Sequence, residues 1–132
     1  MVPVRRLARH CNPFDPVWDT PDLRRHRITL AQVRKCIELR QFEPTPFNPA
    51  SDCPTWRLSR HARRVAYLAV HGWGDPIHID VGVPAMCCHV DWLVEDGNHR
   101  LAAAIVRNDE HIASIISGSH DYCREILGVA PR

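Results

Sequence analysis

Hydrophobic side chains recur at helical spacing over residues 29–40 and predict the first amphipathic helix of the chain. Thr29 followed by Gln32 is typical of a capping box, in which each side chain accepts a hydrogen bond from the backbone N–H of the other residue. Ile28 and Val33 have the spacing of a hydrophobic staple around the same point. The pattern therefore predicts the helix and also the residue at which it begins.

A second amphipathic pattern covers residues 59–71, with Ser59 as the expected N-cap and Gly72 just beyond the end. Prolines interrupt the chain on both sides of the first helix, and proline removes the backbone N–H that a regular element needs. We therefore expect an extended arm over residues 1–21 and a long loop over residues 43–56.

The second half of the chain changes repeatedly between a period of two and a helical period. Alternation predicts a strand over residues 77–83, with Ile77 and Ile79 on the buried face and His78 on the opposite face. A strand, a helix, a strand and a helix are then expected over residues 90–95, 98–107, 112–117 and 120–127. This order predicts the α/β (α+β) class, with a small mixed sheet and flanking helices.

Composition fits one soluble domain. The chain has 132 residues, of which 45% are hydrophobic and 24% are charged. No stretch has the roughly 20 apolar residues that span a bilayer. The basic segment 1–10 lacks the apolar core of a signal peptide, so we expect a cytoplasmic protein.

Charge is small in total and unevenly distributed. The net charge is +2, but arginines are concentrated in the first third of the chain, and Arg60, Arg63 and Arg64 give the second helix a basic face. Such a distribution is typical of a nucleic-acid surface and equally of an ordinary solvated face. For the second helix, the functional alternative is a supporting wall for an anionic ligand.

The six cysteines contain no CxxC pair, and we interpret most of them as small buried hydrophobic residues. Cys87, Cys88 and His89 resemble a fragment of a metal site, but adjacent cysteines fit poorly to the spacing of zinc ligands. No metal-binding residues are therefore assigned. The N-terminal arm is expected to pack through Phe14 and Trp18. Trp56, Trp73 and Trp92 are expected to pack in the interior, with a pocket edge as the alternative for Trp73.

Chemistry is most strongly indicated where Gly97, Asn98, His99 and Arg100 follow a strand and precede an alanine-rich helix. The first turn of a helix has backbone N–H groups without internal partners and carries the positive end of the helix dipole, so phosphate binds there readily. Gly97 allows close approach of the backbone, and Arg100 offers a planar set of donors. His99 could bind an anion when protonated or transfer a proton when neutral.

The segment from Trp92 to Ala104 resembles the signature of the ParB/sulfiredoxin superfamily, including its ParB-like nuclease-domain members, in which Asp-Gly-x-His-Arg precedes Leu-Ala-Ala. The segment from Pro76 to Pro84 is similar to the strand before that motif. The organisation matches over about residues 58–128, so we expect a ParB/sulfiredoxin-like core over 58–132. Residues 1–57 would be an arm, a helix and a proline-rich loop packed on that core.

The resemblance implies a compact fold that binds a nucleotide at the motif turn, with ATP, ADP or CTP as the ligand and Mg²⁺ as a candidate cofactor. Gly97, His99 and Arg100 would contact phosphates. Sulfiredoxins have cysteine at the position of Asn98, and because an amide is not that kind of nucleophile, sulfinic-acid repair is not expected.

Three functions stay open. The first is a nucleotide- or nucleic-acid-phosphate-binding protein that hydrolyses or transfers a phosphoryl group, with Asp96 and His99 as candidate catalytic residues. For phosphoryl transfer, Asp80 and Asp91 are further candidate acids that could hold a metal. Asp96 could alternatively be a turn or capping residue, and Arg100 could pair with Glu95 or Asp96. The second is a non-catalytic interaction protein of a mobile element that acts on a host nucleic-acid-binding protein. The third is a metal-dependent nuclease, although the sequence has no obvious cluster of metal-binding acids.

Overall fold

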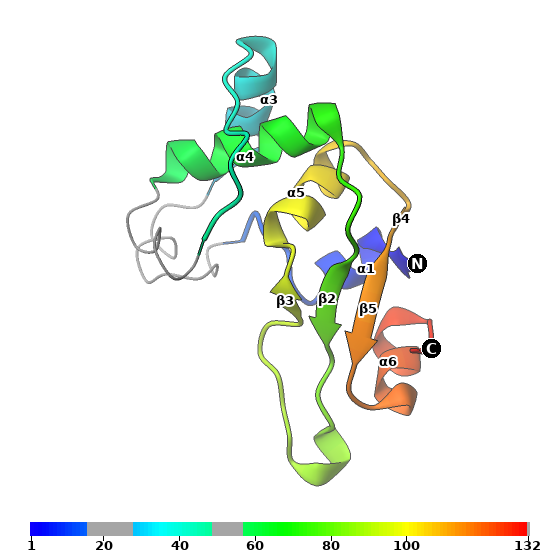
Figure 1. The fold of residues 1–132 in the computed structure, drawn as a ribbon. Helices are drawn as coiled ribbons and strands as arrows, with labels where there is room; N and C mark the ends of the chain where they lie inside the picture. The colour runs from blue at the N-terminus through cyan, green and yellow to red at the C-terminus, as the bar shows by residue number, and fades with distance from the viewer. Residues whose placement is uncertain (16–27, 49–56, 132) are drawn as a thin grey trace.

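The computed structural model describes residues 1–15, 28–48 and 57–131 and confirms the α+β class (Figure 1). A three-stranded sheet has the order β3-β2-β5, and a separate two-stranded sheet pairs β1 with β4. Helices α4 and α5 lie one above the other at one end of the larger sheet, and α6 lies beside β5 (Figure 1). No helix among the described residues is long and apolar enough to cross a membrane.

The larger sheet is mixed because β2 (Ile77–Asp80) pairs antiparallel with β3 (Val94–Asp96) and parallel with β5 (Ser114–Ser117). The predicted alternation along β2 is confirmed, since Ile77 and Ile79 are buried and His78 is exposed. β2 ends earlier than predicted because the Gly82 N–H bonds to Asp80 Oδ1 in a turn, at 2.8 Å, and Gly82 has a φ of +72°.

The strand predicted over residues 112–117 is two strands in different sheets. β4 (His111–Ile112) pairs with β1 (Val2–Pro3), whereas β5 pairs with β2. A single run of apolar residues therefore joins the two sheets. Periodicity alone does not reveal such a change of partner, because both strands have the same pattern.

The expectation of an extended N-terminal arm is wrong for residues 2–8. After β1 the chain forms α1 (Val4–Ala8), and Val2 and Leu7 are fully buried in the same hydrophobic cluster as Leu101. The short apolar period was obscured by Pro3, which in fact occupies the N-cap position, where proline costs the helix no hydrogen bond. Of the two aromatic residues expected to pack this segment, Phe14 is partly buried against the cluster that contains Val33, and Trp18 lies outside the described residues.

Local capping signals were accurate at two of the four longer helices among the described residues. α3 (Leu30–Glu38) has the predicted capping box, with both hydrogen bonds present. α6 (His120–Leu127) begins with the Ser119 hydroxyl accepting from the Tyr122 N–H and ends at left-handed Gly128, as predicted.

α4 (Leu58–His71) ends at Gly72 as predicted, but its N-cap is Arg57, so the assignment of Ser59 as the cap is wrong. Ser59 instead lies within the first turn of the helix.

Small side chains bring α4 close to α5 (Asn98–Val106). Ala62 and Ala66 on α4, and Ala102 and Ala103 on α5, are buried in a cluster that also contains Val65. Alanine leaves little between two helix backbones, so the start of α5 lies against the side of α4. This contact positions the site described below.

Gly97 sets the direction in which α5 leaves β3. Its φ of +113° lies in the left-handed region, and a Cβ at this position would overlap the side chain of Ile77. Glycine is therefore required here for both its backbone conformation and its lack of a side chain.

We expect Gly97→Ala to lower the free energy of unfolding by about 2–4 kcal/mol, from the strain of a positive φ and from overpacking against Ile77. Urea denaturation measures the loss. Gly74→Ala is the matched control, because a Cβ there meets no atom within 4 Å. Equal effects of the two substitutions would contradict this role of Gly97.

Candidate functional site

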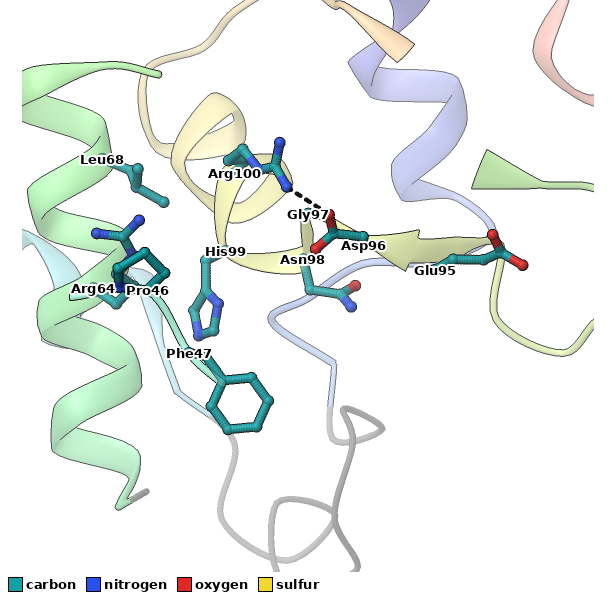
Figure 2. Close-up of a pocket in the computed structure, with 10 residues that line it drawn as sticks. All are labelled: Pro46, Phe47, Arg64, Leu68, Glu95, Asp96, Gly97, Asn98, His99 and Arg100. Carbon is teal, nitrogen blue, oxygen red and sulfur yellow. Dashed lines mark hydrogen bonds and ion pairs between the residues drawn. The ribbon is translucent and has the colours of Figure 1, made fainter. Parts of the chain in front are cut away.

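A cavity of about 400 Å³ lies between the start of α5, the side of α4 and the segment that contains Phe47 (Figure 2). It is lined by Pro46, Phe47, Arg64, Leu68, Glu95, Asp96, Gly97, Asn98, His99 and Arg100. The structure therefore places all five sequence-predicted site residues, from Asp96 to Arg100, at one cavity.

The wall formed by α5 is the first turn of a helix. The Gly97 carbonyl accepts a hydrogen bond from the Leu101 N–H at 2.8 Å, and within the described part of the chain no side chain caps the turn. The positive end of the helix dipole thus lies at the cavity. This is the local arrangement that the sequence predicted for binding of a negatively charged oxygen.

His99 contacts a second histidine that sequence reasoning did not single out. His61 Nδ1 and His99 Nε2 lie 2.8 Å apart, and the two rings are within 12° of parallel. His61 is only 3% exposed, and the ring of Phe47 lies near both imidazoles, with centroids 5.7 and 6.2 Å away. The pair thus joins α4 to α5 behind the cavity.

Both histidines are neutral near pH 7. Burial, followed by the charge of Arg60, lowers the pKa of His61 to about 4. Burial also holds the pKa of His99 well below its usual value, with His61, Arg64 and Arg100 acting in the same direction. In the ligand-free protein, His99 therefore offers an anion a neutral imidazole, and the positive charge at the cavity comes from other groups.

Arg100 is largely engaged within the protein. Its Nη1 donates to the carbonyls of Asp75 and Pro76 at 3.1 and 3.0 Å, and its Nη2 donates to Asp96 Oδ2 at 3.0 Å. These contacts tie the first turn of α5 to the segment before β2. Because the guanidinium has five N–H donors, up to two of them are left for a ligand.

Arg64 reaches the cavity from α4 (Figure 2). Its Nη1 donates to the carbonyls of Pro44 and Glu43 at 2.8 and 3.4 Å and thereby holds the loop that carries Phe47. Burial lowers the pKa of Arg64, whereas Tyr67 and Glu43 act in the opposite direction and Arg100 acts in the same direction as burial. The guanidinium of Arg64 has therefore lost part of its hydration. The basic face predicted for this helix therefore contributes one arginine to the cavity wall.

Asn98 and Asp96 border the cavity in different ways. The Asn98 side-chain oxygen accepts a hydrogen bond from Trp92 Nε1 at 2.8 Å, so its amide is held in one orientation. The Asp96 side chain is 70% exposed and pairs with Arg100. Glu95 is exposed, and its side chain extends away from His99 (Figure 2).

The other predicted acids do not reach the cavity. Asp80 accepts the hydrogen bond from Gly82 that ends β2, and Asp91 is an exposed residue of the connection to β3. Within residues 1–15, 28–48 and 57–131, no group of three or more His, Cys, Asp or Glu side chains is arranged to hold a metal ion.

Among the cysteines, Cys11, Cys36 and Cys123 are buried as predicted, whereas Cys87 and Cys88 are exposed. Burial raises the pKa of Cys11 to about 12, so its thiol is inert. Cys53 and Trp56 lie outside the described residues, while Trp73 and Trp92 are partly buried against the core.

His61 could have been found from the sequence, because it shares a helical face with Val65 and Leu68, at spacings of four and seven residues. A polar residue on an apolar face needs a partner. What the sequence could not supply was the identity of that partner on another helix.

Comparison of the chain with protein-family models, with curated proteins and with solved structures finds no match. The resemblance of the motif to the ParB/sulfiredoxin signature thus stays a prediction. What bears on function is the geometry of the cavity itself.

We expect the neutral histidine pair to make stability depend on pH. The pKa of His61 is about 4 in the folded protein and about 6.5 in the unfolded chain. The stability that the protein gains by keeping His61 neutral is therefore fully present above pH 6.5, and it is lost as the pH falls towards 4. The loss is on the order of 3 kcal/mol. Urea denaturation across this pH range should show that the free energy of unfolding changes less steeply with pH for His61→Asn than for the wild type. The exposed-site variant His78→Asn should retain the wild-type slope, and equal slopes for all three would contradict the argument.

Arg100→Ala should lower the free energy of unfolding by about 1–3 kcal/mol, since it leaves the partly buried carbonyl of Pro76 without its donor. The ion pair with exposed Asp96 should add little to this loss. Chemical denaturation of Arg100→Ala beside Asp96→Asn separates the two contributions. A larger loss for Asp96→Asn than for Arg100→Ala would exclude the carbonyl contacts as the main role of Arg100.

Proposed function

We propose that this chain binds a nucleotide in the cavity, with a phosphate group at the start of α5. The observation that carries the proposal is the arrangement of two arginines, Arg64 and Arg100, around the uncapped first turn of a helix. Backbone N–H groups and guanidinium groups are the donors that phosphate oxygens prefer.

Two arginines and two carboxylates line the cavity, and the Glu95 side chain extends away from His99 (Figure 2). Asp96 pairs with Arg100, and Glu43 pairs with Arg60 at 3.1 Å. Arg64 forms no salt bridge among the described residues, although its charge is partly desolvated. The helix dipole adds to this positive charge, and an incoming phosphate would replace the lost hydration of Arg64.

The size and the apolar wall of the cavity suit the rest of a nucleotide. About 400 Å³ falls within the usual range for small-molecule sites. Phe47 and Leu68 contribute an aromatic ring and an aliphatic side chain at the side of the cavity. Bases stack on aromatic side chains with little dependence on their identity, so this wall supports a nucleotide and leaves the base undetermined.

Hydrolysis or transfer of the bound phosphoryl group is the reaction that we propose to test after binding. A neutral imidazole at a phosphate site can accept a proton from an attacking hydroxyl or water, and His99 has this state near pH 7. Mg²⁺ would arrive with the nucleotide, held by phosphate oxygens, and the exposed carboxylate of Asp96, which lines the cavity, would be a candidate ligand.

Calorimetry with ATP, ADP, CTP and GTP, each with and without Mg²⁺, tests the proposal, and short DNA and RNA oligonucleotides are titrated alongside them. For the nucleotide that binds, Arg64→Ala should weaken affinity by about 1.5–3 kcal/mol, because a charge-assisted contact is lost. Arg63→Ala is the matched control, since Arg63 is an exposed neighbour on the same helix.

Absence of binding to every nucleotide would contradict the proposal. Binding to oligonucleotides alone, followed by their cleavage with added Mg²⁺, would replace it with the nuclease function. The alternative interaction function needs surface substitutions as its test. Deletion of residues 1–21 would remove Val2 and Leu7 from the hydrophobic core and would therefore disturb the fold itself.

A further inference from the structure

The contact between His61 and His99 is unusual because it joins two titratable groups across two helices beside a predicted anion site. His61 is the one polar or charged residue that is almost completely buried in the described part of the chain. At 2.8 Å, the two facing nitrogens must have a single hydrogen between them. That requirement links the tautomers of the two rings. Either both rings carry their hydrogen on Nδ1, or both carry it on Nε2.

The pair can hold one additional proton without losing this contact. In the neutral pair, one ring donates to the other through the shared hydrogen. If a proton from solvent is added to the donating ring at its other nitrogen, which carries no hydrogen in the neutral pair, the result is one imidazolium, one neutral imidazole and the same hydrogen bond between them. The cost of that proton is electrostatic, because it places a positive charge in a buried position.

The charged groups around the pair oppose this proton in the ligand-free protein. Arg60 and Arg64 lie on α4, and Arg100 lies on α5. Among the described residues, the carboxylates of Glu43 and Asp96 are paired with Arg60 and Arg100. Glu95 also borders the cavity, but its side chain is exposed and extends away from His99 (Figure 2). Three cations and the helix dipole therefore act on the pair, and the pKa values of both histidines are lowered.

We propose that the His61–His99 pair couples binding of a phosphate-bearing ligand in this cavity to the uptake of a proton. The inference rests on the proposed function. An anion beside Arg64 and Arg100 reverses the local charge, and the cost of a positive charge on the adjacent pair falls. By linkage, binding then draws a proton from solvent, and a lower pH strengthens binding. The arginines and helix start hold the ligand, and the pair adjusts its charge to the ligand.

Calorimetry of the wild-type protein in two buffers of different ionisation enthalpy measures this proton directly. The probes are sulfate, which keeps its charge in this pH range, and the nucleotide identified in the binding screen. At about pH 5.5 the binding enthalpy should depend on the buffer and correspond to uptake of up to one proton, and at about pH 8 this dependence should vanish. Affinity for sulfate should rise severalfold from about pH 7 to about pH 5.5.

Substitutions test whether this pair, and not another titratable group, takes up the proton. His61→Asn and His99→Asn should each abolish most of the proton uptake, whereas His78→Asn, on the exposed face of β2, should retain it. The ¹⁵N chemical shifts of the histidine rings provide an independent readout, because ligand addition at about pH 5.5 should shift one of the paired rings towards the imidazolium form. This measurement uses the wild type and does not depend on how the variants fold.

Binding with an enthalpy that is independent of buffer at both pH values overturns the coupling and leaves the proposed function intact. Proton uptake that persists in both His61→Asn and His99→Asn also overturns it, because another group would then be the acceptor. Absence of binding to nucleotides and to sulfate at every pH overturns the proposed function and the coupling together.

Discussion

The close contact between α4 and α5 brings together the two helical walls of the cavity. Ala62 and Ala66 face Ala102 and Ala103 in one buried cluster, so the two backbones approach without large side chains between them. Only at that separation can His61 on α4 share a hydrogen with His99 on α5. Arg64 lies one turn further along α4 and therefore lines the cavity on the side opposite the first turn of α5. The alanine-rich sequence after the motif thus helps to build the site, although none of these four alanines lines the cavity.

A second constraint comes from the sheet, because it sets where α5 begins. Ile77 of β2 lies directly against Gly97, and the left-handed conformation of Gly97 turns the chain from β3 into the helix. Arg100 fastens this turn to the carbonyls of Asp75 and Pro76, just before β2. Gly97 and Arg100, which the sequence predicted as ligand contacts, therefore also hold the turn in its conformation. A phosphate site formed by backbone N–H groups depends on such construction, since the amides bind only if the turn is held in place.

The sequence predicted those features that depend on neighbours along the chain. The capping box of α3 and the Ser119 cap of α6 are set within four residues, and both are observed. The motif turn was located for the same reason. Features that depend on distant partners were missed or misplaced. The N-terminal strand forms because it pairs with β4, more than a hundred residues away. His61 has a partner in His99 because α4 packs against α5. Ser59 failed as a cap because the helix begins one residue earlier, at Leu58.

At the proposed anion site, histidine and arginine would have different chemical roles. Arginine is charged at every physiological pH, so Arg64 and Arg100 can supply constant attraction for an anion. A histidine with a permanent charge would add to that attraction but could not accept a proton. Burial against Phe47 and the contact with His61 keep His99 neutral while the surrounding cations remain charged. The site thus keeps a proton acceptor beside a fixed positive field, a combination that a uniformly charged cluster of arginine and imidazolium could not provide.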